Sequence, residues 1–263
     1  MKLTPLSKDH HQDLYLSAHT SFKFISQLTS MPITLYDLPL LATQLPTAFV
    51  KVGEIFELRI ICGIERDENL CVGLDNAVWH LKAFPSPYRS YPFFLANSDD
   101  KFILCFDERS ERINRKNDGQ RVFEETGELS NVAKKAWDDL QRIEKDKLLT
   151  ISAVTELAKK AVLEPWPLEI EIHGEKKILK GLHKVSEPSL SKLSDFEFLE
   201  LRKKGALPLA YLHLSSIQNV PLLSMLKNKR VKELAIRSSQ SEITKRTDKD
   251  FALSEDRLID FDI

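Results

Sequence analysis

The side chains nearest the start of the chain that could do metal chemistry are His11 and Asp13. A His-x-Asp pair is the first half of a facial triad, the ligand set of non-haem iron oxygenases, and His173, His183 or His213 could supply the third ligand. The motif is short, and it precedes any predicted strand that could hold it rigidly. Since no other histidines or cysteines have ligand spacing, the sequence predicts no bound metal.

The clearest pairing of a base with a hydroxyl group is His213 with Ser216. The two are three residues apart in an apolar segment, so on a helix their side chains touch, and an internal hydrogen bond is their expected role. Carboxylate pairs such as Asp138–Asp139 lie on polar faces, where they stay solvated. The chain has neither Gly-x-Ser-x-Gly nor a glycine-rich phosphate loop. We therefore predict no catalytic residues and no cofactor.

The densest chemical pattern is "FPSPYRSYPFFL", residues 84–95, which combines three prolines, aromatic rings and one arginine. The proline after Tyr91 favours an extended backbone at that residue, and in an extended segment Arg89 and Tyr91 share one face. Phe93, with Tyr88 and Phe94, would then anchor the core.

We expect a concave ligand-binding site built from Asn69, Trp79, Arg89 and Tyr91. The alternative interpretation is that the aromatic rings are core and that Arg89 ties the proline-rich loop together through its five donors.

The elements that must position these residues come from one chain of 263 residues, long enough for one large domain or two small ones. With 38 basic and 39 acidic side chains, the chain lacks a basic footprint for nucleic acid. Three cysteines without a Cys-x-x-Cys pair argue against disulfides and zinc, and we expect Cys62, Cys71 and Cys105 to be buried.

Hydrophobic patterning predicts an α+β fold, in which a strand-rich N-terminal part (1–106) packs with C-terminal helices and a β-hairpin. A charged loop (107–127) separates the strands from helices and hairpin in 128–228. The expected elements are strands at 56–64, in "LCVGL", in "AVWHLKAF" and at 101–106; helices at 129–143 and 152–163; a hairpin from 168; a helix from the Ser194–Glu197 capping box to Gly205; and an apolar helical pair broken before Pro221.

The polar segment 229–263 has no clear core face, and we expect it to be a mobile tail. Only its end, with Leu258, Ile259, Phe261 and Ile263, is apolar enough to dock. The N-terminus has no apolar secretion signal and no run is long enough to span a bilayer, so we expect a cytoplasmic protein, although export without a signal stays open.

An ordered set of motifs resembles the bacterial SapC family, which is distinct from the transport permeases that share the name. The set comprises Glu68-Asn69, Trp79 and the block Tyr88-Arg89-x-Tyr91-Pro92-Phe93. The upstream "MPITLYDLPLLATQLPTAFV" is similar as well, with Asp37 where the family tends to have Glu. The similarity continues through "VFEETGELS" and the C-terminal half, covers roughly residues 25–228 and makes 1–228 one SapC-like domain.

The resemblance implies an association with bacterial surface layers and no settled catalytic residues. It also implies genomic neighbours such as hydroxylases and halogenases, whose products are candidate partners. The leading hypothesis is therefore a non-catalytic binding or accessory protein for a protein or small-molecule partner. The alternatives are an oxygenase-like enzyme with an unrecognised site and a component of surface-layer assembly.

Overall fold

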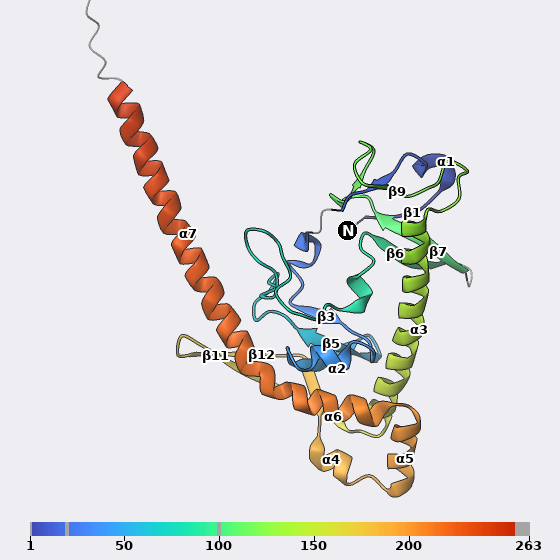
Figure 1. Ribbon diagram of the computed structural model, residues 1–263. Coiled ribbons are helices and arrows are strands. Elements are labelled where there is room, and N and C mark those ends of the chain that lie inside the picture. Colours follow the sequence, from blue (N-terminus) through green and yellow to red (C-terminus); the bar gives the residue numbers. More distant parts are fainter. Residues whose placement is uncertain (1, 19–20, 99–100, 256–263) are drawn as a thin grey trace, which may run out of the picture.

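The computed structural model describes residues 2–18, 21–98 and 101–255 (Figure 1). The chain combines several short antiparallel sheets with one long helix (Asn131–Lys159) and a C-terminal series of helices. The predicted α+β class is confirmed. No helix in the described ranges is long and apolar enough to cross a membrane.

The largest sheet has five antiparallel strands in the order β10-β13-β4-β5-β3. Its centre is the hairpin of β4 and β5, and β5 coincides with the strand predicted at 56–64. The chain returns to it more than a hundred residues later through β13. The strands are β3 (Ser30–Pro32), β4 (Thr47–Val52), β5 (Ile55–Ile61), β10 (Leu163–Pro165) and β13 (Leu182–Val185).

Three smaller sheets surround it. One has the order β1-β7-β6, a second has the order β8-β2-β9, and β11 with β12 forms the predicted hairpin. The strands β8 and β9 both come from the charged loop 107–127. They pair with opposite edges of β2 and not with each other. The strands are β1 (Leu3–Pro5), β2 (Tyr15–Leu16), β6 (Phe93–Ser98), β7 (Lys101–Asp107), β8 (Ile113–Asn114), β9 (Gln120–Arg121), β11 (Leu168–Ile172) and β12 (Glu175–Leu179).

The helices include one long element where we expected two. No Gly or Pro interrupts residues 144–151, so the two predicted helices continue as a single helix, α3. The capping box at Ser194 is confirmed, and Gly205 has the left-handed backbone that ends α5. The helices are α1 (Lys8–His11), α2 (Leu38–Leu41), α3 (Asn131–Lys159), α4 (Glu187–Ser191), α5 (Asp195–Lys203), α6 (Ala206–Ser216) and α7 (Val220–Glu255), with 3₁₀ turns η1 (Lys23–Ile25), η2 (Ser86–Tyr88) and η3 (Ile217–Asn219).

Two hydrophobic cores lie along α3. The larger joins the five-stranded sheet, α6 and the loop 62–84, and the smaller joins the β1-β7-β6 sheet to the N-terminal half of α3. Phe93 is 2% exposed in the smaller core, as predicted, while Tyr88 and Phe94 are half-buried. All three cysteines are buried.

One expectation about the chain's path is wrong. Segments "LCVGL" and "AVWHLKAF" form loops joined by a bridge between Val72 and Trp79, not strands. The polar segment from 229 continues α7, which runs to Glu255 and extends away from the sheets (Figure 1), and its mobility stays a prediction. The apolar end with Leu258, Ile259, Phe261 and Ile263 lies outside the described residues, and a domain boundary at residue 228 stays a prediction.

Candidate functional site

The four residues predicted to bind a ligand do not line one cleft. Tyr91, Arg89 and Asn69 each line a different hollow of the surface, and Trp79 is buried beside the Ala83–Phe84 segment. The expected extended backbone at 88–91 is also wrong. Residues 86–88 form η2, and the Tyr91 N–H donates to the Tyr88 carbonyl, because Pro85 and Pro87 preset the backbone angle that a 3₁₀ turn needs.

Arg89 ties the proline-rich loop together. Its Nε and Nη2 both donate to the Phe84 carbonyl, at 3.1 and 2.9 Å, and its guanidinium lies 3.5 Å from the buried Asp37. Trp79 contacts the same segment, since its indole N–H donates to the Ala83 carbonyl at 2.8 Å. These contacts agree with the alternative interpretation, in which Arg89 ties the proline-rich loop together.

Asn69 is fully buried and acts through its amide. The side-chain NH₂ donates to the Ile25 carbonyl at 3.0 Å, and the side-chain oxygen accepts the Cys71 N–H at 3.0 Å. It thereby fixes η1 against the loop 62–77. Because η1 carries Phe24, Asn69 positions one wall of the hollow at Tyr91.

The Tyr91 hollow combines an aromatic wall with polar and charged side chains. It has a volume of about 300 Å³. The rings of Phe24 and Tyr91 are stacked with their centroids 3.6 Å apart, and the Tyr91 hydroxyl donates to the buried carboxylate of Asp107 over 3.4 Å. The residues that line the hollow are Ser21, Lys23, Phe24, Tyr91, Asp107, Arg109, Ser110, Glu111 and Arg112.

Tyr91 and Arg112 both keep their protons near neutral pH. Burial raises the pKa of Tyr91 above its ordinary value, so the phenol remains a hydrogen-bond donor. Burial lowers the pKa of Arg112, and the Tyr91 side chain opposes this, yet an arginine remains a cation in this range. The hollow therefore presents a fixed donor, a fixed cation and the Asp107 carboxylate.

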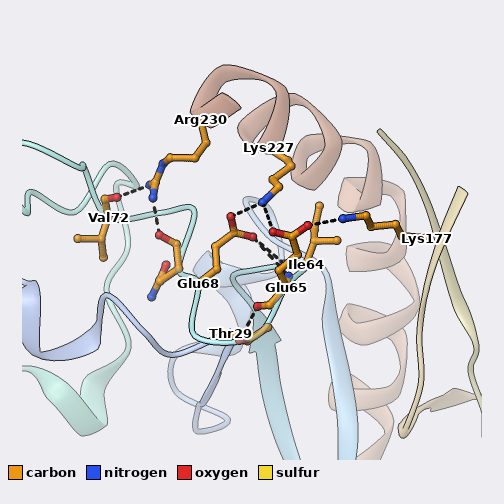
Figure 2. Close-up of polar contacts among 9 residues, drawn as sticks. Thr29, Ile64, Glu65, Glu68, Val72, Lys177, Lys227 and Arg230 are labelled. Atoms are coloured by element: carbon orange, nitrogen blue, oxygen red, sulfur yellow. Dashed lines mark hydrogen bonds and ion pairs between the residues drawn. The ribbon is translucent and has the colours of Figure 1, made fainter. Parts of the chain in front are cut away.

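A second polar cluster joins α7 to the loop 62–77 (Figure 2). We call it the α7 latch; its residues are Glu65, Glu68, Lys177, Lys227 and Arg230. Lys227 is 8% exposed and donates to Glu65 and to Glu68, at 2.6 Å each. Arg230 donates to the carbonyls of Asn69 (3.3 Å) and Val72 (2.5 Å).

The two carboxylates of the α7 latch are matched by the ammonium groups of Lys177 and Lys227. Hydrogen bonds from Lys177 and Lys227 lower the pKa of Glu65 to about 2. Burial alone would lower the pKa of Lys227, but its hydrogen bonds to Glu65 and Glu68 raise it above the ordinary value. The loop itself needs Gly63, since a Cβ there would overlap with the Glu68 carbonyl. Lys177 and Lys227 pair with Glu65 and Glu68, and Arg230 donates to two carbonyl groups of the loop, so the latch holds α7 against the loop 62–77.

His11 and Asp13 both have structural partners, whereas the buried Nδ1 of His183 has no hydrogen-bond partner among the described residues. His11 accepts the Ser7 N–H through Nδ1 at 3.0 Å, and Asp13 pairs with Arg115. Within the described residues, no group of three or more His, Cys, Asp and Glu side chains is placed to hold a metal ion.

His213 and Ser216 form a buried network with Thr47. Ser216 donates to the His213 carbonyl at 2.6 Å, and Thr47 Oγ1 lies 2.9 Å from His213 Nδ1 and 2.8 Å from Ser216 Oγ. Burial lowers the pKa of His213 to about 3, so its ring is neutral near pH 7. The internal hydrogen bonding expected of this pair is confirmed.

Sequence reasoning missed Arg112, Asp107 and Lys227. Arg112 lies in a charged loop, Asp107 at a strand end and Lys227 in a polar helix, where single charges give no periodic signal. Asp107 and Arg112 fall at the start of the charged loop 107–127, and an acid directly after a buried strand was the one available signal.

Comparison with known proteins gives one match. The model of the SapC family matches residues 6–223. The chain belongs to the SapC family. No curated protein and no solved structure matches it. The Tyr91 hollow lies inside the part that matches the SapC model, whereas Lys227 and Arg230 of the α7 latch follow it in sequence.

Proposed function

We propose that this SapC-family chain is a non-catalytic binding protein, acting as an accessory protein, that holds a small ligand in the Tyr91 hollow. The observation that carries the proposal is the composition of that hollow. An aromatic wall of Phe24 and Tyr91 faces a few convergent polar groups, which is the usual make-up of a small-molecule site. Its volume of about 300 Å³ suits a ligand the size of a substituted ring.

The protonation states of Tyr91 and Arg112 support ligand binding over acid–base catalysis in the hollow. The Tyr91 phenol and the Arg112 guanidinium hold their protons around neutral pH, because burial moves the pKa of Tyr91 upward and arginine is a very weak acid. A general acid or base works best when its pKa lies near the working pH. These two groups are suited to orienting a ligand.

Two serines that flank η1 allow a matched test. Ser21 lines the Tyr91 hollow, while Ser26 lines the separate hollow beside Asn69 and Arg230. We expect Ser21→Trp to fill the first hollow and Ser26→Trp to fill the second, with both variants folded because both serines lie at the surface of η1.

The experiment is a ligand-observed ¹⁹F NMR screen of fluorinated fragments against the wild type and both variants. We expect hits that Ser21→Trp abolishes and Ser26→Trp retains. A wild type without hits would contradict the proposal, as would hits that survive Ser21→Trp.

A further inference from the structure

Arg112 has no acidic partner in the described part of the chain. Its Nη1 donates to the Tyr91 carbonyl at 2.5 Å and its Nε to the Ser17 carbonyl at 3.4 Å, which leaves Nη2 without a partner among the described residues. The guanidinium is half-buried. Burying a cation against carbonyl groups alone is unfavourable, since carbonyl dipoles replace water only in part.

A second cation of the same hollow is also unpaired. The Arg109 side chain is exposed, lines the hollow and makes no ion pair with a described residue. The acids nearby are already engaged. Asp107 accepts the backbone N–H groups of Lys2 and Arg109, at 2.8 and 3.2 Å, and Glu111 pairs with Lys23 at 3.2 Å.

We infer that the ligand of the Tyr91 hollow is a small organic carboxylate with a flat apolar body. This inference rests on the proposed function and names the ligand class. Arg109 and Arg112 supply the positive charge, and the guanidinium fork matches the two oxygens of a carboxylate. The stacked Phe24 and Tyr91 rings supply the apolar wall for the body.

The charge pattern decides against a cationic ligand. The buried Asp107 carboxylate already accepts three hydrogen bonds, from two backbone amides and from the Tyr91 hydroxyl. A carboxylate has about four acceptor positions, so one is left for a ligand. Arg112 and Arg109 together offer more free donors than Asp107 offers free acceptors.

The test is calorimetric titration with benzoate, benzamide and benzylamine, which share a ring and differ in charge. We expect benzoate to bind at least tenfold more tightly than benzamide and benzylamine to bind weakest. Arg109→Gln should weaken benzoate binding about tenfold, the worth of one charge-assisted hydrogen bond, and leave benzamide unchanged. Arg115→Gln is the control, since this exposed arginine pairs with Asp13 outside the hollow.

The outcomes separate the ligand class from the proposed function. If benzamide or benzylamine binds as tightly as benzoate and Ser21→Trp abolishes that binding, the hollow binds ligands but the carboxylate inference is wrong. If benzoate does not bind at millimolar concentration, or binds equally to Arg109→Gln, the carboxylate inference is likewise wrong. Failure of the fragment screen at Ser21 would overturn the proposed function itself.

Discussion

Two buried or half-buried cations in this protein meet opposite surroundings. Lys227 in the α7 latch reaches two carboxylates at 2.6 Å each, whereas Arg112 in the Tyr91 hollow reaches two carbonyl oxygens and no carboxylate among the described residues. Where charges are matched, the fold uses them to fix one element on another. In the Tyr91 hollow, Arg112 meets only carbonyl groups beside an aromatic wall, and we propose that its charge stays available to a ligand. Arg230 also meets only carbonyl groups, but its hollow has no aromatic wall and is lined by the acids Glu65, Asp67, Glu68 and Asp75.

Among the charged side chains compared, removal of the matched cation Lys227 should have the largest effect on stability. Lys227→Met leaves the carboxylate of Glu68, which is only 13% exposed, without its cation, while Glu65 keeps its pair with Lys177. We expect a loss of about 2–3 kcal/mol in the free energy of unfolding, less than for a fully buried pair because Glu65 is half exposed. Urea denaturation measures it.

The matched control is Lys229→Met on the same helix. Lys229 is exposed and pairs with Glu233 at 3.8 Å, so its loss should cost less than about 0.5 kcal/mol. Equal effects of the two substitutions would show that the α7 latch contributes nothing beyond an exposed pair.

The unmatched cation should matter less for stability. Arg112→Gln removes hydrogen bonds to the Tyr91 and Ser17 carbonyls but leaves no carboxylate without its cation. We therefore expect a loss of about 1–2 kcal/mol in the free energy of unfolding. If Arg112→Gln destabilises as much as Lys227→Met in the same urea series, Arg112 is a structural residue and the contrast between the two sites disappears.

Low pH should weaken the α7 latch. The pKa of Glu65 is about 2 in the folded protein and near 4.5 in its ordinary state, so the unfolded chain binds the proton more tightly. Its stabilising contribution is therefore complete above pH 4.5 and is lost as the pH falls toward 2. The cost of Glu65→Gln should shrink over that interval when unfolding is measured at several pH values.

The Tyr91 hollow provides the control for this series. Glu111→Gln breaks the pair with Lys23, in which both side chains are more than half exposed, and should cost little at pH 7. A cost of Glu65→Gln that stays constant from pH 7 to pH 2 would contradict the assignment.

Among the predicted changes at the two sites and the proline-rich loop, control substitutions aside, Arg89→Ala should have the smallest effect on stability. The side chain is 45% exposed, and Asp37 keeps its hydrogen bonds from Thr34 and Ser86 without it. We expect a loss of about 1 kcal/mol or less, against about 3–5 kcal/mol for the buried Phe93→Ala, and unchanged benzoate binding. A loss equal to that of Phe93→Ala would make Arg89 an essential tether, and altered benzoate binding would extend the site to the proline-rich loop.

Much of the fold follows from local patterns. Alternation predicted β5 and the β11–β12 hairpin, spacing predicted the start of α3, and capping residues predicted α5. The short strands β2, β8 and β9 could not be predicted, because two-residue strands carry no periodicity and pair across about a hundred residues.

The site was predictable only in part. Tyr91 stood out because it belongs to a dense aromatic and proline-rich stretch. Its partners did not, since Phe24, Asp107 and Arg112 come from separate segments that meet through tertiary packing. The sequence predicts Asn69 as a ligand-binding residue. Its side-chain amide instead forms hydrogen bonds with the backbone of Ile25 and Cys71, which position η1.

The most direct test is chemical-shift mapping of benzoate on isotope-labelled protein. We predict saturable shifts of the amide and guanidinium signals of Arg109 and Arg112 and of the Phe24 amide, with Lys227 and Arg230 unchanged. Shifts centred on Lys227 and Arg230, or no saturable shifts near Arg112, would contradict the claim that the unmatched cation marks the binding site.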